Sequence, residues 1–165
     1  MRNQPWINHS KIRGTCLLAL AAAITSGAAA QIAPAPANAA KQAIENRKSV
    51  FTLIGTNFRP IGEILRGNLK PESVDVGKYT SRVAFLATFV DESFPEISRS
   101  GDTRAKPEIW SDHDAFEKRV KDFQEHTHAL SQLATGAASN SDAFKAAART
   151  VVQDCQGCHD SYRNK

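Results

Sequence analysis

Five consecutive residues near the C-terminal end of the sequence, Cys155-Gln156-Gly157-Cys158-His159, have the types and spacing for chemistry. On a helix, two cysteines three residues apart lie on one face, about one turn from each other. Both thiols can therefore reach the two vinyl groups on one edge of a haem and form thioethers with them. The histidine that follows can then bind the haem iron as an axial ligand. This spacing is the signature of haem c attachment.

Three other interpretations of the cysteine pair are weaker. A structural zinc site needs two more ligands, yet there is no second CxxC, and the other histidines beyond the N-terminal segment are His113, His126 and His128. A thioredoxin-like redox pair is expected near a βαβ pattern, which this sequence lacks. A disulfide across one helical turn has poor geometry. The cysteines also share a helical face with Phe144 and Val151, which directs the motif into an apolar core and favours haem.

Four amphipathic helical segments, with no convincing strand, account for the chain beyond its N-terminal segment. We expect helices over residues 41–66 and 71–93, a third that begins with a capping box at Ser111, and a fourth that begins near Ser141. A connection rich in turn residues, 94–110, separates the second helix from the third. Because the links are short at two of the three junctions, the sequence predicts an all-α fold, an antiparallel four-helix bundle.

Each predicted helix has one apolar face, and burying the four faces against one another would hold a small domain together. Pro60 interrupts the pattern of the first helix, so we expect a kink or a short break there. The predicted core residues are Ile44, Phe51, Ile54, Phe58, Ile61 and Leu65; Val76, Tyr79, Val83, Leu86 and Val90; Phe116, Val120, Phe123, Thr127, Leu130 and Ala134; and Phe144, Ala148, Val151, Cys155, Cys158 and Tyr162.

Residues 1–30 have the three parts of a secretory signal peptide. A basic start is followed by an apolar stretch from Cys16 and then by small residues. We expect cleavage after Ala30, or at a later site near Ala40, and export to the periplasm. The apolar stretch is too short for a transmembrane helix, and a charge just before Cys16 argues against a lipid anchor. Residues 31–40, rich in Ala and Pro, are predicted to be a disordered leader to one domain over residues 41–165.

The net charge of the exported chain is predicted to be close to zero. The full sequence has a formal net charge of +4, but Arg2, Lys11 and Arg13 leave with the signal peptide. The remaining 18 Lys and Arg face 17 Asp and Glu, which gives a formal net charge of +1. This balance offers no global attraction for a polyanion, so nucleic acid is excluded as a partner.

One cation interrupts the apolar face of the first predicted helix. Arg47 lies between Ile44 and Phe51, where the pattern favours an apolar residue. A buried cation needs an anionic partner, and a haem propionate would provide one. Alternatively, Arg47 lies at the end of the bundle and extends its guanidinium to water.

Together these features resemble the class II cytochromes c, the cytochrome c′ family, over essentially the whole chain beyond the signal peptide. This family has its haem motif near the C-terminus, followed by a tyrosine and an arginine, whereas most other c-type cytochromes have it near the N-terminus. Three segments carry the resemblance: Cys155-Gln-Gly-Cys-His-Asp-Ser-Tyr-Arg163, Ala105-Lys-Pro-Glu-Ile-Trp110 and Arg47-Lys-Ser-Val-Phe51.

The resemblance implies one covalent haem c, held by Cys155 and Cys158, with His159 as the only protein ligand of the iron. It also implies a set of residues beside the haem: Arg47, Lys48 and Asp102 near the propionates, and Arg163 at the proximal face. The family usually has a different residue at position 48. The first two helices commonly form a homodimer interface in such proteins, so a homodimer is a further expectation.

The sixth coordination position of the iron is predicted to be open. Low-spin members of the family use a methionine of the first helix, but the only methionine here is Met1, which leaves with the signal peptide. By the resemblance, Phe51 occupies the distal position, and a phenyl ring cannot bind iron. We therefore expect a five-coordinate, high-spin haem that binds small neutral ligands such as NO and CO. The alternative ligands are His113, His126, His128 and Lys48.

Two functions remain open at this point. The chain is either a carrier that exchanges single electrons with a redox partner protein, or a dedicated NO-binding protein that sequesters the gas. An open iron favours the second function, while no sequence feature identifies a docking surface for the first. A peroxidase-type enzyme is not expected, because no convincing acid–base histidine faces the predicted haem.

Overall fold

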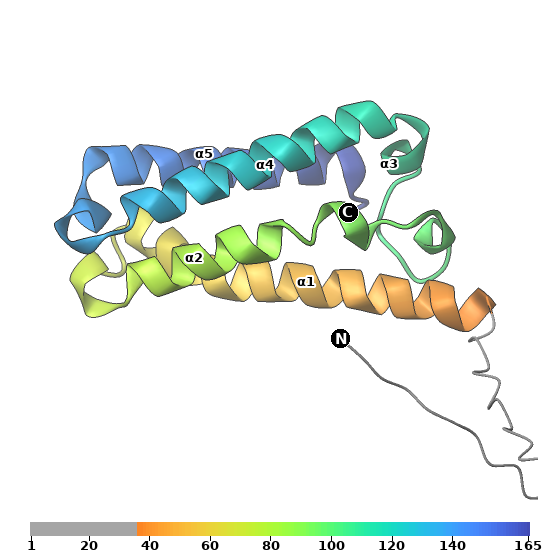
Figure 1. Ribbon diagram of the computed structural model, residues 1–165, viewed down its shortest axis with the longest axis horizontal. Helices are drawn as coiled ribbons and strands as arrows, with labels where there is room; N and C mark the ends of the chain where they lie inside the picture. The colour runs from red at the N-terminus through yellow and green to blue at the C-terminus, as the bar shows by residue number, and fades with distance from the viewer. Residues whose placement is uncertain (1–35) are drawn as a thin grey trace, which may run out of the picture. The chain divides into compact units, whose positions relative to one another are not determined.

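A computed structural model describes residues 36–165, in which four long helices form an antiparallel bundle (Figure 1). Helix α1 packs against α2, α2 against α4, and α4 against α5. The predicted fold class is confirmed. The predicted signal peptide lies outside the described residues.

The long helices are α1 (Pro36–Leu65), α2 (Val76–Ala87), α4 (His113–Leu133) and α5 (Asp142–Tyr162). The short ones are α3 (Glu108–Ser111) and the 3-10 helices η1 (Pro71–Ser73), η2 (Asp91–Ser93), η3 (Glu96–Ser98) and η4 (Gly136–Asn140).

Helix α1 differs from its prediction at two points. It begins at Pro36 rather than at residue 41, so residues 36–40 of the predicted leader are helical. Proline suits a first helical turn, and the alanines that follow are strong helix formers. Pro60 lies inside α1 without ending it. The hydrogen bond lost at a proline is offset here by packing, because Ile61, the next residue, and Ile64, one turn further on, are buried in the core.

The second predicted helix, residues 71–93, is divided into η1, α2 and η2. Asp75 causes the late start of α2, because its carboxylate accepts a hydrogen bond from the backbone N–H of Lys78 at 2.9 Å and so caps the helix there. At the other end, Thr88 and Val90 bond three residues back, to Phe85 and Ala87, as in a 3-10 turn. The chain therefore leaves α2 at Ala87 and begins an irregular connection.

The third helix has a different start from the predicted one, whereas the fourth begins as predicted. Residues 108–111 form α3, and the chain bends at Asp112 (φ −130°, ψ 60°) before α4 begins. No side-chain hydrogen bond caps α4, so the predicted capping box at Ser111 is wrong. The hydroxyl of Ser141 accepts a hydrogen bond from the N–H of Phe144 at 3.1 Å and caps α5.

The core consists of two apolar clusters, and the predicted core residues lie in or against them, except Ile44, which is buried near Gly101, and Thr127, which is buried on α4. The Phe144 cluster contains Ile61, Ile64, Val76, Leu130, Ala134, Phe144, Ala148 and Val151. The Phe116 cluster contains Ile54, Val83, Val90, Ile109, Phe116, Val120 and Tyr162. Across residues 36–165, no helix is long and apolar enough to cross a membrane.

Candidate haem site

Cys155 and Cys158 lie on α5 at the junction of the two clusters. Cys155 packs against the Phe144 cluster and Cys158 against the Phe116 cluster, and both side chains are half-buried. Phe58 of α1 and Phe123 of α4 pack against both clusters. The two thiols form no disulfide. They therefore present two sulfur atoms, one helical turn apart, to the apolar region where the clusters meet.

Burial keeps both thiols protonated. It raises the pKa of Cys155 to about 11, and the charge of Asp154 and the neighbouring Cys158 add to the rise. Burial also raises the pKa of Cys158, although the positive charge of Arg119 opposes it. At neutral pH the pair is thus a pair of neutral thiols in apolar surroundings.

His159 reaches the surface at the end of α5. Partial burial of the ring lowers the pKa of His159, and the positive charges of Arg163 and Arg104 lower it further, against the opposing charge of Asp160. The neutral imidazole therefore prevails at neutral pH, and a neutral imidazole has the lone pair that binds a metal ion. The backbone N–H of Arg163, one turn further along the chain, donates to the His159 carbonyl at 3.1 Å.

Arg47 is buried, with 5% of its surface exposed, so it does not extend to water. Its guanidinium donates to the hydroxyls of Ser98 and Thr103 at 2.7 Å each, and lies 4.7 Å from the ring centre of Phe94. Longer bonds, at 3.4 and 3.5 Å, reach the carbonyls of Ser93 and Ser98. Burial lowers the pKa of Arg47. Within residues 36–165 no carboxylate forms an ion pair with this cation, so no acidic side chain neutralises its charge.

Lys48 and Asp102 come together beside this position. The Lys48 ammonium pairs with the carboxylates of Asp102 at 3.0 Å and of Glu45 at 3.2 Å. The hydrogen bond to Asp102 contributes most to raising the pKa of Lys48. Both carboxylates raise the pKa of Lys48 and so favour its charged ammonium form, which has no lone pair for a metal ion.

Phe51 begins a chain of edge-to-face aromatic contacts that leads from α1 to α5. Its ring centre is 6.1 Å from that of Phe94, which lies 5.0 Å from Phe116, and Phe116 lies 5.2 Å from Tyr162. The indole N–H of Trp110 donates to the Phe94 carbonyl at 3.0 Å. Sequence reasoning missed Phe94, because it lies in the connection, where helical periodicity gives no signal.

The three remaining histidines have other surroundings. His113 stacks on Phe116 with ring centres 6.4 Å apart and is exposed. Nδ1 of His126 lies 2.8 Å from the carboxylate of Asp154, which joins α4 to α5. His128 is exposed. Among residues 36–165, no group of three or more His, Cys, Asp or Glu side chains is placed to hold a metal ion, so the cysteine pair has no partners for a zinc site.

Arg119 was not anticipated from the sequence either. One terminal nitrogen of its guanidinium would lie 3.2 Å from a side-chain carbon added at Gly157, so the group rests against the turn between the two cysteines. A glycine at this position leaves room for the guanidinium. Only the tertiary contact between α4 and α5 could have indicated this placement.

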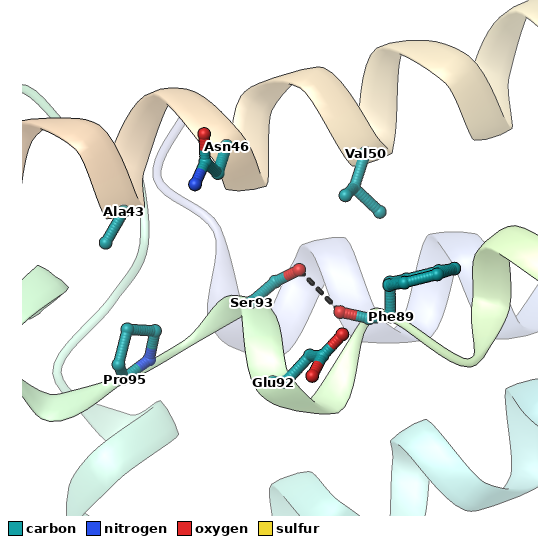
Figure 2. Close-up of a pocket in the computed structure, with 7 residues that line it drawn as sticks. All are labelled: Ala43, Asn46, Val50, Phe89, Glu92, Ser93 and Pro95. Atoms are coloured by element: carbon teal, nitrogen blue, oxygen red, sulfur yellow. Dashed lines mark hydrogen bonds between the residues drawn. The ribbon is translucent and has the colours of Figure 1, made fainter.

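A surface groove of about 300 Å³ lies between α1 and η2 (Figure 2). On one side of the groove, the hydroxyl of Ser93 donates a hydrogen bond to the carbonyl of Phe89 at 2.6 Å. The groove is lined by Ala43, Asn46, Val50, Phe89, Glu92, Ser93 and Pro95. Neither cysteine borders it, so it is separate from the candidate haem site.

A family model described as cytochrome c′ matches residues 42–163. The chain belongs to the cytochrome c′ family. It is 29% identical to the cytochrome c′ of Alcaligenes xylosoxydans xylosoxydans over 76% of this chain and 95% of that protein. The solved cytochrome c′ of Shewanella frigidimarina is 32% identical, with a TM-score of 0.67 over 81% of this chain and 99% of that chain.

Two solved relatives hold a gas. A ferrous variant of the Alcaligenes xylosoxidans cytochrome c′ has bound NO, and another variant has bound carbon monoxide. They are 27% and 28% identical to this chain, each with a TM-score of 0.68 over 76% of this chain and 96% and 97% of their own. Membership of the cytochrome c′ family makes the cofactor one covalent haem c, and the protein a haem protein rather than an enzyme.

The residues of the candidate site fit that cofactor on two observations. The two thiols meet the junction of the apolar clusters from one helical face, which suits a flat apolar macrocycle. The buried guanidinium of Arg47 has only neutral hydrogen-bond partners and an aromatic face around it, which suits a carboxylate at the edge of that macrocycle.

Proposed function

We propose that this cytochrome c′ is a periplasmic redox protein that exchanges single electrons with a partner protein and binds NO and CO at an open iron position. Haem c supplies the one-electron chemistry and the gas-binding iron when it is bound. Cys155 and Cys158 hold it by thioether bonds, and His159 is the only protein ligand. Arg47 binds a propionate, and Arg163 flanks the proximal side.

The position of the cysteine pair between the two clusters carries this proposal. A haem attached there would have the Phe144 cluster on one side and the aromatic chain of the Phe116 cluster on the other. Each thiol faces an apolar environment, so the macrocycle would be shielded from water. This shielding also favours neutral gases over charged ligands, because a charged ligand would lose its hydration.

The distal side has no protein ligand in this proposal. The single methionine of the sequence is Met1, and the phenyl ring of Phe51 packs against the same cluster as Cys158. The Lys48 ammonium is engaged by the carboxylates of Asp102 and Glu45. An apolar site without a hydrogen-bond donor leaves NO and CO as the ligands of choice.

A dedicated NO-sequestering role is the second candidate function. The apolar surroundings of Phe51 favour this role because they offer the iron no ligand and leave one of its positions open. An open iron position is of no use to a protein that only carries electrons. Rates of reduction by a small inorganic reductant and NO affinity, measured on one preparation, separate the two functions. Fast electron exchange with negligible NO binding would leave only the carrier, and tight NO binding with slow exchange only the sequestering role.

A homodimer through α1 and α2 forms part of the proposal. Large apolar side chains are exposed on both helices, Leu53 at 49% on α1 and Phe85 at 64% on α2. Phe85 stacks edge-on with Phe89, with ring centres 5.2 Å apart, so the apolar surface extends beyond one residue. Sedimentation of the wild type and of Phe85→Glu tests this, and a monomeric wild type would contradict it.

The haem assignment is tested by expressing the full chain in a bacterial host that attaches haem c in the periplasm. The expected product has covalent haem in the pyridine haemochrome assay, a high-spin ferric spectrum, and a ferrous spectrum that changes with CO. The Cys155→Ala/Cys158→Ala variant should retain no covalent haem. Cys16→Ala, which changes the third cysteine of the sequence, is the matched control and should retain it. A low-spin ferric spectrum would contradict the open iron position.

A further inference from the structure

The connection before α3 crosses the end of α5 and forms paired backbone bonds with it. The N–H of Lys106 donates to the Tyr162 carbonyl at 2.9 Å, and the N–H of Asn164 donates to the Arg104 carbonyl at 2.8 Å. Ala105 and Arg163 form an antiparallel bridge between these bonds. In Figure 1 the C-terminus lies beside the connection that leads to α3. We name residues 103–106 the strap.

Lys106 satisfies three consecutive carbonyls of the last turn of α5. Its ammonium donates hydrogen bonds to the carbonyls of Asp160 at 2.9 Å and Ser161 at 3.2 Å. Its backbone N–H donates to the carbonyl of Tyr162. The last carbonyls of a helix have no partner within the helix. A cation there also complements the negative end of the helix dipole. This turn begins at His159, so Lys106 fixes the turn that carries the predicted iron ligand.

The other end of the strap is joined to the buried cation of α1. The hydroxyl of Thr103 accepts a hydrogen bond from Arg47 at 2.7 Å and another from the N–H of Ala105 at 3.1 Å. Arg104 adds a side-chain bond from its Nε to the carbonyl of Asn164 at 2.9 Å. Hydrogen bonds therefore run continuously from α1 through the strap to the end of α5.

We propose that Lys106 is a positioning residue for His159: its ammonium holds the final turn of α5 so that the imidazole keeps one orientation toward the iron. This inference rests on the proposed function, because it takes His159 as the axial ligand. The ring of a histidine follows the backbone of its own turn, so a loosened turn gives a range of ring orientations. Lys106 itself touches neither the iron nor a gas ligand.

The test compares Lys106→Met with wild type in the haem-loaded protein. Methionine retains an unbranched side chain but has neither the charge nor the donors. We expect the backbone amides of residues 160–164 to exchange their hydrogens about 5- to 30-fold faster. We also expect the iron–histidine stretching band of the ferrous protein, measured by resonance Raman spectroscopy, to broaden and move to lower frequency. Lys106→Arg retains charge and donors and should restore both readouts.

Lys70→Met is the matched control, because Lys70 is exposed in the connection between α1 and α2, at the opposite end of the bundle. It should leave both readouts at wild-type values. If Lys106→Met does not accumulate, Lys106→Gln, which retains one polar donor group, replaces it with a smaller expected effect on both readouts.

Two results would overturn the inference while leaving the proposed function intact. One is an unchanged iron–histidine band together with unchanged amide exchange. The other is faster exchange with an unchanged band, which would make Lys106 a structural cap with no influence on the iron ligand. A wild-type protein without covalent haem would instead overturn the proposed function, and this inference with it. The pyridine haemochrome assay distinguishes these cases.

Discussion

The two apolar clusters of the bundle are built differently. The buried members of the Phe144 cluster, except Ala134, come from the regular helices α1, α2, α4 and α5. Residues outside the long helices pack against both clusters: Leu69 and Val74 against the Phe144 cluster, and Phe94, Ala105 and Trp110 against the Phe116 cluster. Arg47 lies over Phe94 and brings a buried charge to that side. The cysteine pair borders both clusters, but only the Phe116 cluster has a buried charge and a chain of aromatic rings beside it.

The largest expected effect tests this division directly. Phe144 is fully buried, and Phe144→Ala should lower the free energy of unfolding by about 3–5 kcal/mol, through lost transfer energy and a cavity. Its reduced absorption spectrum should remain that of wild type. Phe116→Ala should lose a similar amount and also change the spectrum. Denaturant titration gives the stability of both variants. Equal spectral changes in both would show that the clusters do not differ in function.

Arg47→Met should have the next largest effect, because it removes a buried cation from the side of the Phe116 cluster. If a propionate is its anionic partner, the haem-loaded protein loses hydrogen bonds to a charged group, which contribute about 1.5–3 kcal/mol. Denaturant titration followed in the haem band measures the loss. Arg66→Met is the control at the other end of α1, where an exposed guanidinium pairs with Glu63 and the expected loss is at most about 1 kcal/mol. Equal losses would remove the case for a propionate partner.

The two clusters also differ in how much of their structure could be predicted from the sequence. Every predicted core position of the Phe144 cluster is buried or packed against it, because regular helices convert residue spacing directly into a face. Cys155 and Cys158 could be found for the same reason. Phe94, Thr103 and Lys106 could not, since they lie in a connection whose path is fixed by tertiary contacts. The extent of the helices also differed at Asp75, whose carboxylate caps α2, and at Asp112, where the backbone bends before an uncapped α4.

Phe51 offers a sharper test of what the Phe116 cluster does. If its ring shields the distal side, Phe51→Ala should raise the rate of CO association about tenfold or more, which corresponds to about 1.4 kcal/mol of activation free energy. Flash photolysis of the CO complex measures this rate. Leu53→Ala is the matched control, since Leu53 lies two residues away on α1 but is 49% exposed. An unchanged rate in Phe51→Ala would show that another group limits access to the iron.

The smallest expected effect comes from substitutions at the N-terminal ends of α5 and α4. The Ser141 hydroxyl caps α5, the helix that carries the cysteines and also supplies Phe144. Ser141→Ala should lower the free energy of unfolding by about 1 kcal/mol. Ser111 precedes α4 on the other side, where no side chain caps the helix, and Ser111→Ala should change stability by less than about 0.5 kcal/mol. The denaturant midpoints of the two variants are the measurement. Ser141→Ala removes a cap that the structure contains, and Ser111→Ala removes one that only the sequence pattern predicts. A larger loss for Ser111→Ala would mean that α4 is capped in solution after all, and that the connection around the Phe116 cluster is more regular than the structure describes.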